Sequence, residues 1–133
     1  MLNDFHIKTN ERYELVNITA NVESIIKERG VDGGLVFVSV PHSTAAILLT
    51  EDEPNLKKDW LEFLRQMASG FNFLHNQIDD NGDSHLLSGI LGQNRSLLIE
   101  KGKLEKGFWQ EIFLAEFDGP KVRKIIVKII SEK

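Results

Sequence analysis

The final third of the chain consists of three segments with strand-like composition, and only short turns separate them. The turns contain glycine or proline, which are frequent where a chain reverses direction. A parallel connection needs a crossover of about a dozen residues or more, so turns this short favour antiparallel pairing. The strands are expected at residues 95–100, 109–118 and 123–130. An antiparallel sheet is therefore the most constrained part of the fold.

The rest of the sequence predicts further strands and three helices. Strands are expected at residues 5–7, 13–18, 35–40 and 44–50, and helices at about 20–29, 56–69 and 84–91. Thr19 and Ser84 are the expected N-caps of the first and third helices. Because helices are few and turns are short, the sequence favours an α+β fold over βαβ winding. We expect an antiparallel β-rich core, sandwich-like or barrel-like, with two main flanking helices and a short third helix.

Length and composition limit the kinds of site and partner. A chain of 133 residues suits one domain over residues 1–133. It has no cysteine, so a metal would need His, Asp or Glu ligands. Its 16 basic and 20 acidic residues give a net charge of −4, which argues against non-specific nucleic-acid binding. No apolar run approaches the roughly 20 residues of a membrane span, and residues 1–12 lack a secretory leader. We therefore expect a cytoplasmic protein with no nucleic-acid or membrane partner.

The first candidate segment follows a strand that is expected to be buried. Pro41 breaks the strand, and His42, Ser43 and Thr44 come directly after it. A strand end is a natural place to present polar groups to a ligand. The alternative is a turn in which the two hydroxyl groups only satisfy nearby backbone groups.

The second segment is an acidic loop between two histidines. His75 and His85 are ten residues apart and enclose the turn-forming sequence around Asn81 and Gly82. Two imidazoles that flank a loop can converge on one centre, and a borderline divalent cation such as zinc would suit them. The spacing matches no established zinc motif, so solvated or capping histidines are the alternative.

The third segment lies on the expected strand at 109–118. Alternation puts Gln110 and Glu116 on the same face as Ile112 and Leu114. A carboxylate on an apolar face is costly unless it is paired or liganded. Glu116 is therefore a candidate metal ligand or a base with a raised pKa, unless this is an edge strand on which it meets water.

The fourth segment is a turn that begins at Asp118 and contains Gly119 and Pro120. Lys121 and Arg123 follow it closely and could bind an anion such as a phosphate. A charged hairpin turn without a ligand is the alternative.

Taken in order, these segments resemble the YjbQ family, UPF0047, described as secondary thiamine-phosphate synthase enzymes. The matching pieces are His42-Ser43-Thr44-Ala45-Ala46, Thr50-Glu51, His75, Asn81-Gly82-Asp83-Ser84-His85-Leu86, Gly107-Phe108-Trp109-Gln110 and Glu116-Phe117-Asp118-Gly119-Pro120. They cover nearly the whole chain, and their order makes the set specific. Three positions depart from the family pattern: Thr50 stands for Asn, Phe108 for Thr and Lys121 for Arg.

The resemblance implies a homotrimer that acts on small phosphorylated metabolites. The implied activity is a transferase reaction that joins a hydroxymethylpyrimidine diphosphate to a thiazole phosphate and releases pyrophosphate, possibly as a side activity. A non-catalytic homotrimer that binds a metal or small ligand is the alternative, and a purely structural assembly module is a third.

Together, the residues and the resemblance give one expected site. His42, His85 and Glu116 are its expected catalytic residues. A divalent ion such as zinc or magnesium would be held by His42, His75, His85 and Glu116. The expected substrate-binding residues are Ser43, Thr44, Glu51, Asn81, Gln110, Lys121 and Arg123. His6 lies outside every matching segment and is expected to be structural.

Overall fold

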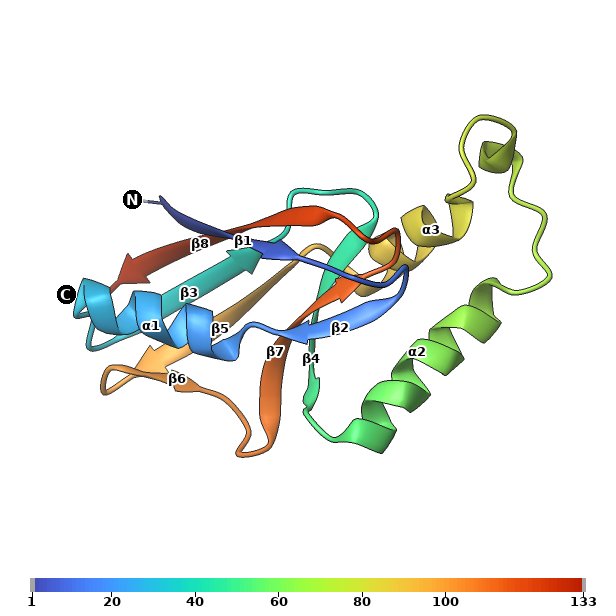
Figure 1. Cartoon of the computed structure of the whole chain (residues 1–133). Coiled ribbons are helices and arrows are strands. Elements are labelled where there is room, and N and C mark those ends of the chain that lie inside the picture. Colours follow the sequence, from blue (N-terminus) through green and yellow to red (C-terminus); the bar gives the residue numbers. More distant parts are fainter. Residues whose placement is uncertain (1, 133) are drawn as a thin grey trace.

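The structure is a computed structural model that describes residues 2–132. Along the chain, the helices lie between pairs of strands in the first two thirds, and strands alone make up the last third (Figure 1). The strands are β1 (Leu2–Lys8), β2 (Glu14–Asn17), β3 (Gly34–Ser39), β4 (Ala45–Glu51), β5 (Asn94–Glu100), β6 (Lys103–Glu105), β7 (Gln110–Glu116) and β8 (Val122–Ser131). The helices are α1 (Thr19–Arg29), α2 (Pro54–Ala68) and α3 (Gly82–Leu91), with a 3-10 turn η1 (Leu74–Gln77) before α3.

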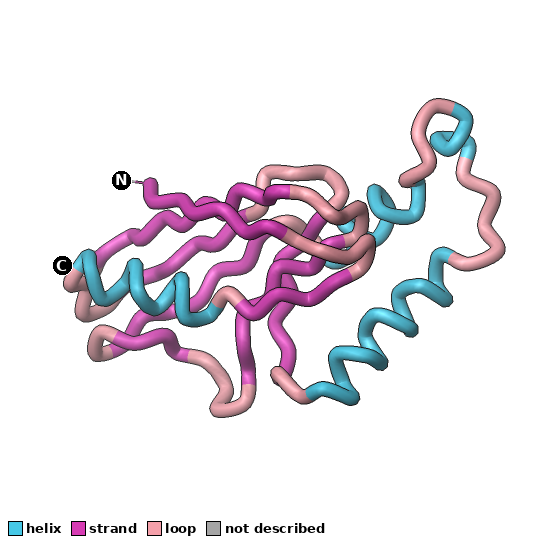
Figure 2. Tube along the Cα trace, viewed as in Figure 1, coloured by secondary structure: helices cyan, strands magenta, loops and turns pink. Residues whose placement is uncertain are grey.

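The strands form two antiparallel sheets, which confirms the predicted α+β class. The larger sheet has the order β1-β8-β3-β5-β6, and the smaller one has the order β2-β7-β4. Both sheets of the described residues are open, and neither closes into a barrel. Figure 2 shows the strands side by side, with α2 and α3 to one side of them and α1 to the other.

Strand β7 lies in the middle of the smaller sheet and is buried on both faces. Ile112 and Leu114 point into a core shared with α1 and the larger sheet. Phe113 and Ala115 point the other way, into a second core that includes Leu64 of α2 and residues of α3. The alternation predicted from the sequence is therefore correct, and the alternative of an exposed edge strand is wrong.

The helices begin close to their predicted positions, but two of the expected caps are wrong. The hydroxyl of Thr19 accepts a hydrogen bond from Ile112 N, and Asn17 Oδ1 accepts from Thr19 N instead. The Ser84 hydroxyl donates to the carbonyl of Phe117. Both hydroxyls therefore bind neighbouring segments rather than the starts of their own helices. None of the helices in residues 2–132 has the length and hydropathy needed to cross a membrane.

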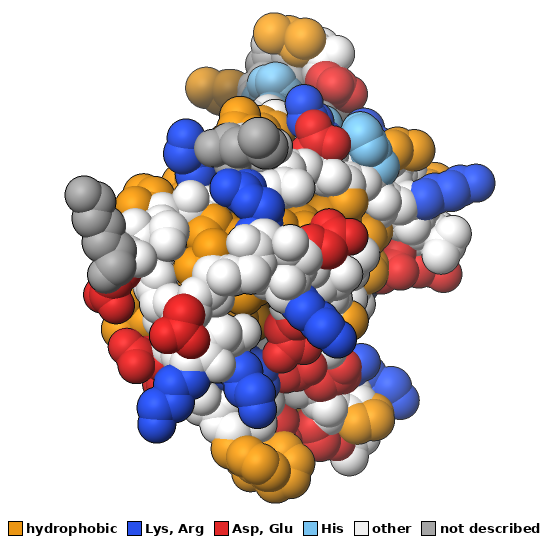
Figure 3. Space-filling model, turned by 90° about the vertical axis from the view of Figure 1, so that its left-hand side faces the viewer, with side chains coloured by type: hydrophobic (Ala, Val, Ile, Leu, Met, Phe, Trp, Pro, Cys, Tyr) orange, Lys and Arg blue, Asp and Glu red, His pale blue; other side chains and the backbone are white. Residues whose placement is uncertain are grey.

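The segment between α2 and α3 projects from the body of the molecule and carries exposed apolar side chains (Figure 1). We call residues 67–91 the arm. Its largely exposed apolar residues are Met67, Phe71, Leu74, Ile78, Leu86 and Ile90. Elsewhere, on the face drawn in Figure 3, acidic and basic side chains are interspersed.

Candidate functional site

Two of the predicted histidines meet in the arm. His75 lies in η1 and His85 in the first turns of α3, and their ring centroids are 4.7 Å apart in an edge-to-face arrangement. Both line a cavity of about 520 Å³ whose other walls are mostly apolar. Those walls come from Phe71, Phe73, Leu74 and Leu86, with Asn72 and Gly82. The predicted convergence of the two imidazoles therefore occurs within one chain.

A chain of hydrogen bonds connects His75 through Asn81 to Asp118. Nε2 of His75 lies 2.9 Å from Asn81 Oδ1, and Asn81 Nδ2 donates to Asp118 Oδ2 at 2.9 Å. Lys121 Nζ pairs with the same Asp118 oxygen at 3.0 Å. Asn81 is buried at the start of α3, whereas Asp118 follows the end of β7. The site is thus assembled from segments that are far apart in the sequence.

The ionisation of Asp118 follows from these contacts. Burial raises its pKa, but the hydrogen bonds from Asn81 and Lys121 outweigh burial and hold the pKa below its ordinary value of 3.8. Asp118 is therefore a carboxylate at neutral pH, and its Oδ2 accepts from Asn81 Nδ2 and lies 3.0 Å from Lys121 Nζ. Lys121 is committed to Asp118, which limits how freely it can reach an anionic ligand.

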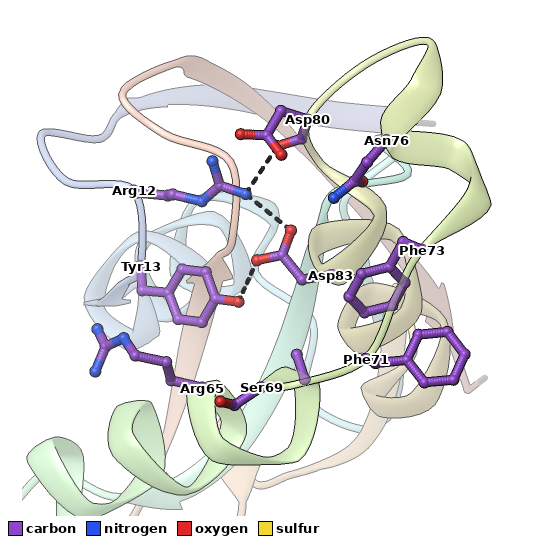
Figure 4. A pocket seen from close by; sticks show the side chains of 10 residues that line it. Arg12, Tyr13, Arg65, Ser69, Phe71, Phe73, Asn76, Asp80 and Asp83 are labelled. Carbon is purple, nitrogen blue, oxygen red and sulfur yellow. Dashed lines mark hydrogen bonds and ion pairs between the residues drawn. The ribbon is translucent and has the colours of Figure 1, made fainter.

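The first turn of α3 is also tied to the body of the molecule. Arg12 Nη2 donates to Asp83 Oδ1 at 2.8 Å, and the Tyr13 hydroxyl donates to Asp83 Oδ2 at 2.6 Å (Figure 4). Burial, followed by the bond to Asp83, raises the pKa of Tyr13. These residues line a second cavity of about 320 Å³, which shares Phe71 and Phe73 with the first. The contacts fix the helix that carries His85.

Glu116 lies beneath the surface in an ion pair with Arg123. Arg123 Nε donates to Glu116 Oε1 at 2.9 Å, and the Thr9 hydroxyl donates to the same oxygen at 2.8 Å. Glu116 Oε2 accepts from Asp118 N and from Arg123 Nη2. Both oxygens are thus engaged, and the side chains of Glu116 and Arg123 are 0% and 2% exposed. Their contacts are those of an internal ion pair rather than of a metal ligand and a phosphate-binding residue.

The expected raised pKa of Glu116 is wrong in sign. Burial does raise it, but the hydrogen bonds from Arg123, Asp118 N and Thr9 outweigh burial and hold the pKa below its ordinary value of 4.5. Gly119 lets the chain pass close to this pair. A Cβ atom there would collide with the Glu11 carbonyl and lie 2.9 Å from both Glu116 Cγ and Thr9 Oγ1.

His42 lies beside β8 rather than beside His75 and His85. Its Nε2 accepts a hydrogen bond from Lys124 N at 3.2 Å, and Lys124 is paired in register with His6 of β1. Burial and then the nearby Arg123 guanidinium hold the pKa of His42 below its ordinary value of 6.5. Beside it, Ser43 is exposed, whereas Thr44 is buried and accepts a hydrogen bond from Arg123.

Glu51 and Gln110 lie at the other end of the smaller sheet. The register pairs Glu51 with Gln110, whereas Ala45 pairs with Glu116 six residues further along each strand. Six residues of strand span about 20 Å, so this pair is remote from Glu116. The Gln110 side chain accepts a hydrogen bond from Gly107 N at 2.8 Å. The predicted residues therefore form three groups within one chain.

The expected metal ligands do not come together around one centre. Across residues 2–132, no three His, Asp or Glu side chains are close enough together to hold a metal. His75 and His85 supply two imidazoles, fewer than the three protein ligands typical of a catalytic zinc site. The four expected ligands therefore do not form a complete metal site in a single chain.

A comparison with protein families identifies the chain. The model of the family described as "UPF0047 protein YjbQ-like" matches residues 3–132. The chain belongs to this family. The UPF0047 protein MJ1081 of Methanocaldococcus jannaschii is 42% identical over 135 residues, covering 100% of this chain and 96% of that protein. The UPF0047 protein YugU of Bacillus subtilis is 34% identical, covering 98% of this chain and all of that protein.

Solved structures of similar proteins have the same fold. A YbjQ-like protein of unknown function from Sulfolobus solfataricus P2 superposes with a TM-score of 0.96 at 40% identity, covering 99% of this chain and 97% of that chain. A hypothetical protein from Aeropyrum pernix K1 gives a TM-score of 0.96 at 35% identity, covering 99% of each chain. These relatives share the architecture, and their descriptions assign no reaction.

Asp118 is one residue of this UPF0047 site to which the sequence pattern assigns no role. The sequence shows it only as the residue at which the turn with Gly119 and Pro120 begins. Its contact with Asn81 joins residues 37 positions apart, so no local pattern predicts it. Arg12 and Tyr13 were missed for the same reason, because they reach Asp83 across about 70 residues.

Proposed function

We propose that the cavity beside His75 and His85 binds small phosphorylated metabolites and performs a group transfer of the thiamine-phosphate synthase type. The observation that carries the proposal is the pair of contacting imidazoles at the wall of an apolar cavity. Apolar walls with a few convergent polar groups are typical of small-molecule sites. The family resemblance supplies the reaction class.

The proposed reaction needs a proton donor for its leaving group. The ring nitrogen of the thiazole phosphate attacks the methylene carbon of the pyrimidine diphosphate and forms a carbon–nitrogen bond. The carbon–oxygen bond breaks, and pyrophosphate leaves with that electron pair. A positioned imidazolium can transfer its proton to the departing oxygen. No oxidant or reductant is required.

His85 is the residue that we assign as this acid. Among the hydrogen bonds of residues 2–132, none engages a ring nitrogen of His85, so both nitrogens are open to a ligand. His75 is held by Asn81 and would contact the ligand through its other nitrogen. In an alternative version without a histidine acid, the two imidazoles and further ligands would hold a divalent ion, which would offset the charge of the pyrophosphate.

A homotrimer would bring the remaining predicted residues to the site. His42, Glu51 and Gln110 lie outside the cavity of their own chain. If they take part, a neighbouring copy must supply them. The exposed apolar side chains of the arm provide a surface for such a contact. We therefore propose a homotrimer with the site at or near the contact between copies.

The substitution His85→Ala tests the proposed activity. We expect the turnover of the two phosphorylated substrates to fall by about 10²–10⁴-fold, the usual contribution of a general acid. Pyrophosphate release is the measurement. His6→Ala is the matched control, because His6 is an exposed histidine on β1 outside the cavity. Undiminished turnover in a folded His85→Ala variant would contradict the assignment.

A non-catalytic binding protein is the second candidate, and one observation favours it. Both Glu116 oxygens are engaged, so the expected carboxylate base is not open to the cavity. This candidate predicts saturable binding of zinc or of a phosphorylated heterocycle without turnover. Calorimetry with each ligand, run beside the pyrophosphate assay, distinguishes the two candidates.

A further inference from the structure

The orientation of the Asn81 amide is determined by Asp118. At neutral pH the carboxylate of Asp118 can only accept hydrogen bonds. The amide of Asn81 has one donor end and one acceptor end, so its Nδ2 must face Asp118, at 2.9 Å. Its Oδ1 then faces His75. Because the opposite orientation would place two acceptors in contact, this assignment follows from chemistry.

The orientation of Asn81 in turn determines where the proton of His75 lies. Oδ1 of an amide can only accept, so Nε2 of His75 must donate across the 2.9 Å contact. In the neutral ring, the other nitrogen then carries a lone pair. Among the hydrogen bonds of residues 2–132, none involves Nδ1 of His75, so this lone pair is open.

We propose that Asp118 is a positioning residue that acts through Asn81 to hold His75 in the Nε2–H tautomer, with Nδ1 presented to the ligand. The proposal rests on the proposed site but deepens it by naming the ligand-contacting atom. That atom would accept a hydrogen bond from the ligand or bind a cation. It cannot donate a hydrogen bond while the ring is neutral.

Each member of this relay is itself held in place. Asp118 N donates to Glu116 Oε2 at 2.9 Å, so the buried ion pair with Arg123 fixes the backbone that carries the carboxylate. Asn81 is 7% exposed, and its carbonyl accepts from His85 N as α3 begins. The Asn81 amide therefore has little freedom to rotate by 180°. The buried Glu116–Arg123 ion pair thus helps to position the relay as well as to stabilise the fold.

The two imidazoles consequently have different roles. His75 is restrained to one tautomer, whereas both ring nitrogens of His85 have no hydrogen-bond partner in the described chain. A fixed acceptor beside an unrestrained ring suits a site in which His75 orients the ligand.

Nitrogen-15 NMR of the histidine rings in the full chain tests the proposal at pH 8, where imidazoles are mainly neutral. Signals of His75 are identified by their loss in a His75→Gln variant. We expect a protonated Nε2 and an unprotonated Nδ1 in the wild type. In Asp118→Asn the new amide can donate or accept, so Asn81 is no longer oriented and the His75 signals should shift toward a mixture of tautomers.

Asp79→Asn is the matched control, since it makes the same change at an exposed residue of the arm and should leave the His75 signals unchanged. A protonated Nδ1 or a tautomer mixture in the wild type would overturn the proposal without any substitution. So would an unchanged His75 tautomer in folded Asp118→Asn. Neither measurement requires turnover, so this proposal and the proposed reaction can fail separately.

Discussion

The charged residues inside this protein are satisfied mainly by one another. Glu116 and Arg123 are almost fully buried, and the hydroxyls of Thr9 and Thr44 complete their hydrogen bonds. No buried side-chain nitrogen or oxygen of residues 2–132 lacks a partner. Such a network stabilises the fold only while it is complete, because a buried charge without its partner is costly.

Glu116→Gln should therefore destabilise the protein strongly at neutral pH. Removing one member of a buried pair costs about 3–5 kcal/mol of unfolding free energy. The folded-state pKa of Glu116 lies below its ordinary 4.5, so its stabilisation is present above pH 4.5 and is lost as the pH falls through the folded-state pKa. The difference in unfolding free energy between wild type and Glu116→Gln should therefore become smaller as the pH falls. Urea unfolding at a series of pH values is the measurement.

Glu111→Gln, on the same strand, serves as the control for this prediction. Glu111 pairs with Lys106 at a more exposed position, where an ion pair contributes about 1 kcal/mol at most. If the two substitutions lowered the unfolding free energy equally at pH 7, the buried pair would contribute no more to stability than the exposed one, which would contradict the prediction.

The sequence indicates that Glu116 is unusual, but it does not indicate which group Glu116 binds. A carboxylate on an apolar face must have a partner, and that much follows from composition and alternation. The partner could be a metal, a ligand or a cation of the same chain. Arg123 takes the position because β7 ends in a tight turn and β8 returns beside the first core, a tertiary arrangement that local pattern does not specify.

Among the secondary-structure elements, α2 has the most explicit start signal. The Glu53 side chain accepts hydrogen bonds at 2.8 Å from Asn55 N and from Leu56 N, and Pro54 occupies the first turn. These bonds satisfy two backbone donors that the helix itself leaves unpaired.

Glu53→Ala should lower the free energy of unfolding by about 1 kcal/mol, the usual effect of removing an N-cap. Thermal and urea unfolding are the measurements. Glu62→Ala is the matched control, since that exposed residue in the middle of α2 bonds only to side chains of its own helix. A loss from Glu62→Ala as large as that from Glu53→Ala would contradict the capping role.

Elements whose signal is local were predicted well. The alternation of β7 depends on neighbours within a few residues, and it is confirmed. The hydroxyls of Thr19 and Ser84 were misassigned because each has a partner on another element. Short polar side chains such as Ser and Thr cap their own helix, as local sequence predicts, only when no group on another element competes for the hydroxyl.

At the scale of the whole molecule, the sheet register decides which candidate residues can act together. His75, Asn81 and His85 meet because η1 lies against the start of α3. Gln110 is separated from them because it begins the strand that Glu116 ends. No motif spacing encodes these distances, so the common site expected from the sequence is distributed over three places.

The proposed homotrimer gives a prediction at this scale. In light scattering coupled to gel filtration, the wild type should have a mass near three times 15.1 kDa. Leu74 and Ile78 are 78% and 87% exposed on the arm, so changing both to Asp should place charges in the contact and shift the mass toward one chain. Circular dichroism should be unchanged. A wild type that remains a single chain at micromolar concentration would contradict the proposed homotrimer.

Because β7 is shared by both cores, it limits where the coding sequence could be split into separately folding parts. Its side chains enter both cores, and it arrives late in the chain, at Gln110–Glu116. A shortened product that ends before this strand would lose the central strand of the smaller sheet, which lies between β2 and β4, together with the side chains that it places in both cores. The part of the chain before β7 could not fold without it, and recombination within the gene could not transfer that part as a separate unit. A longer protein would arise more readily by duplication of the whole domain or by fusion at its ends.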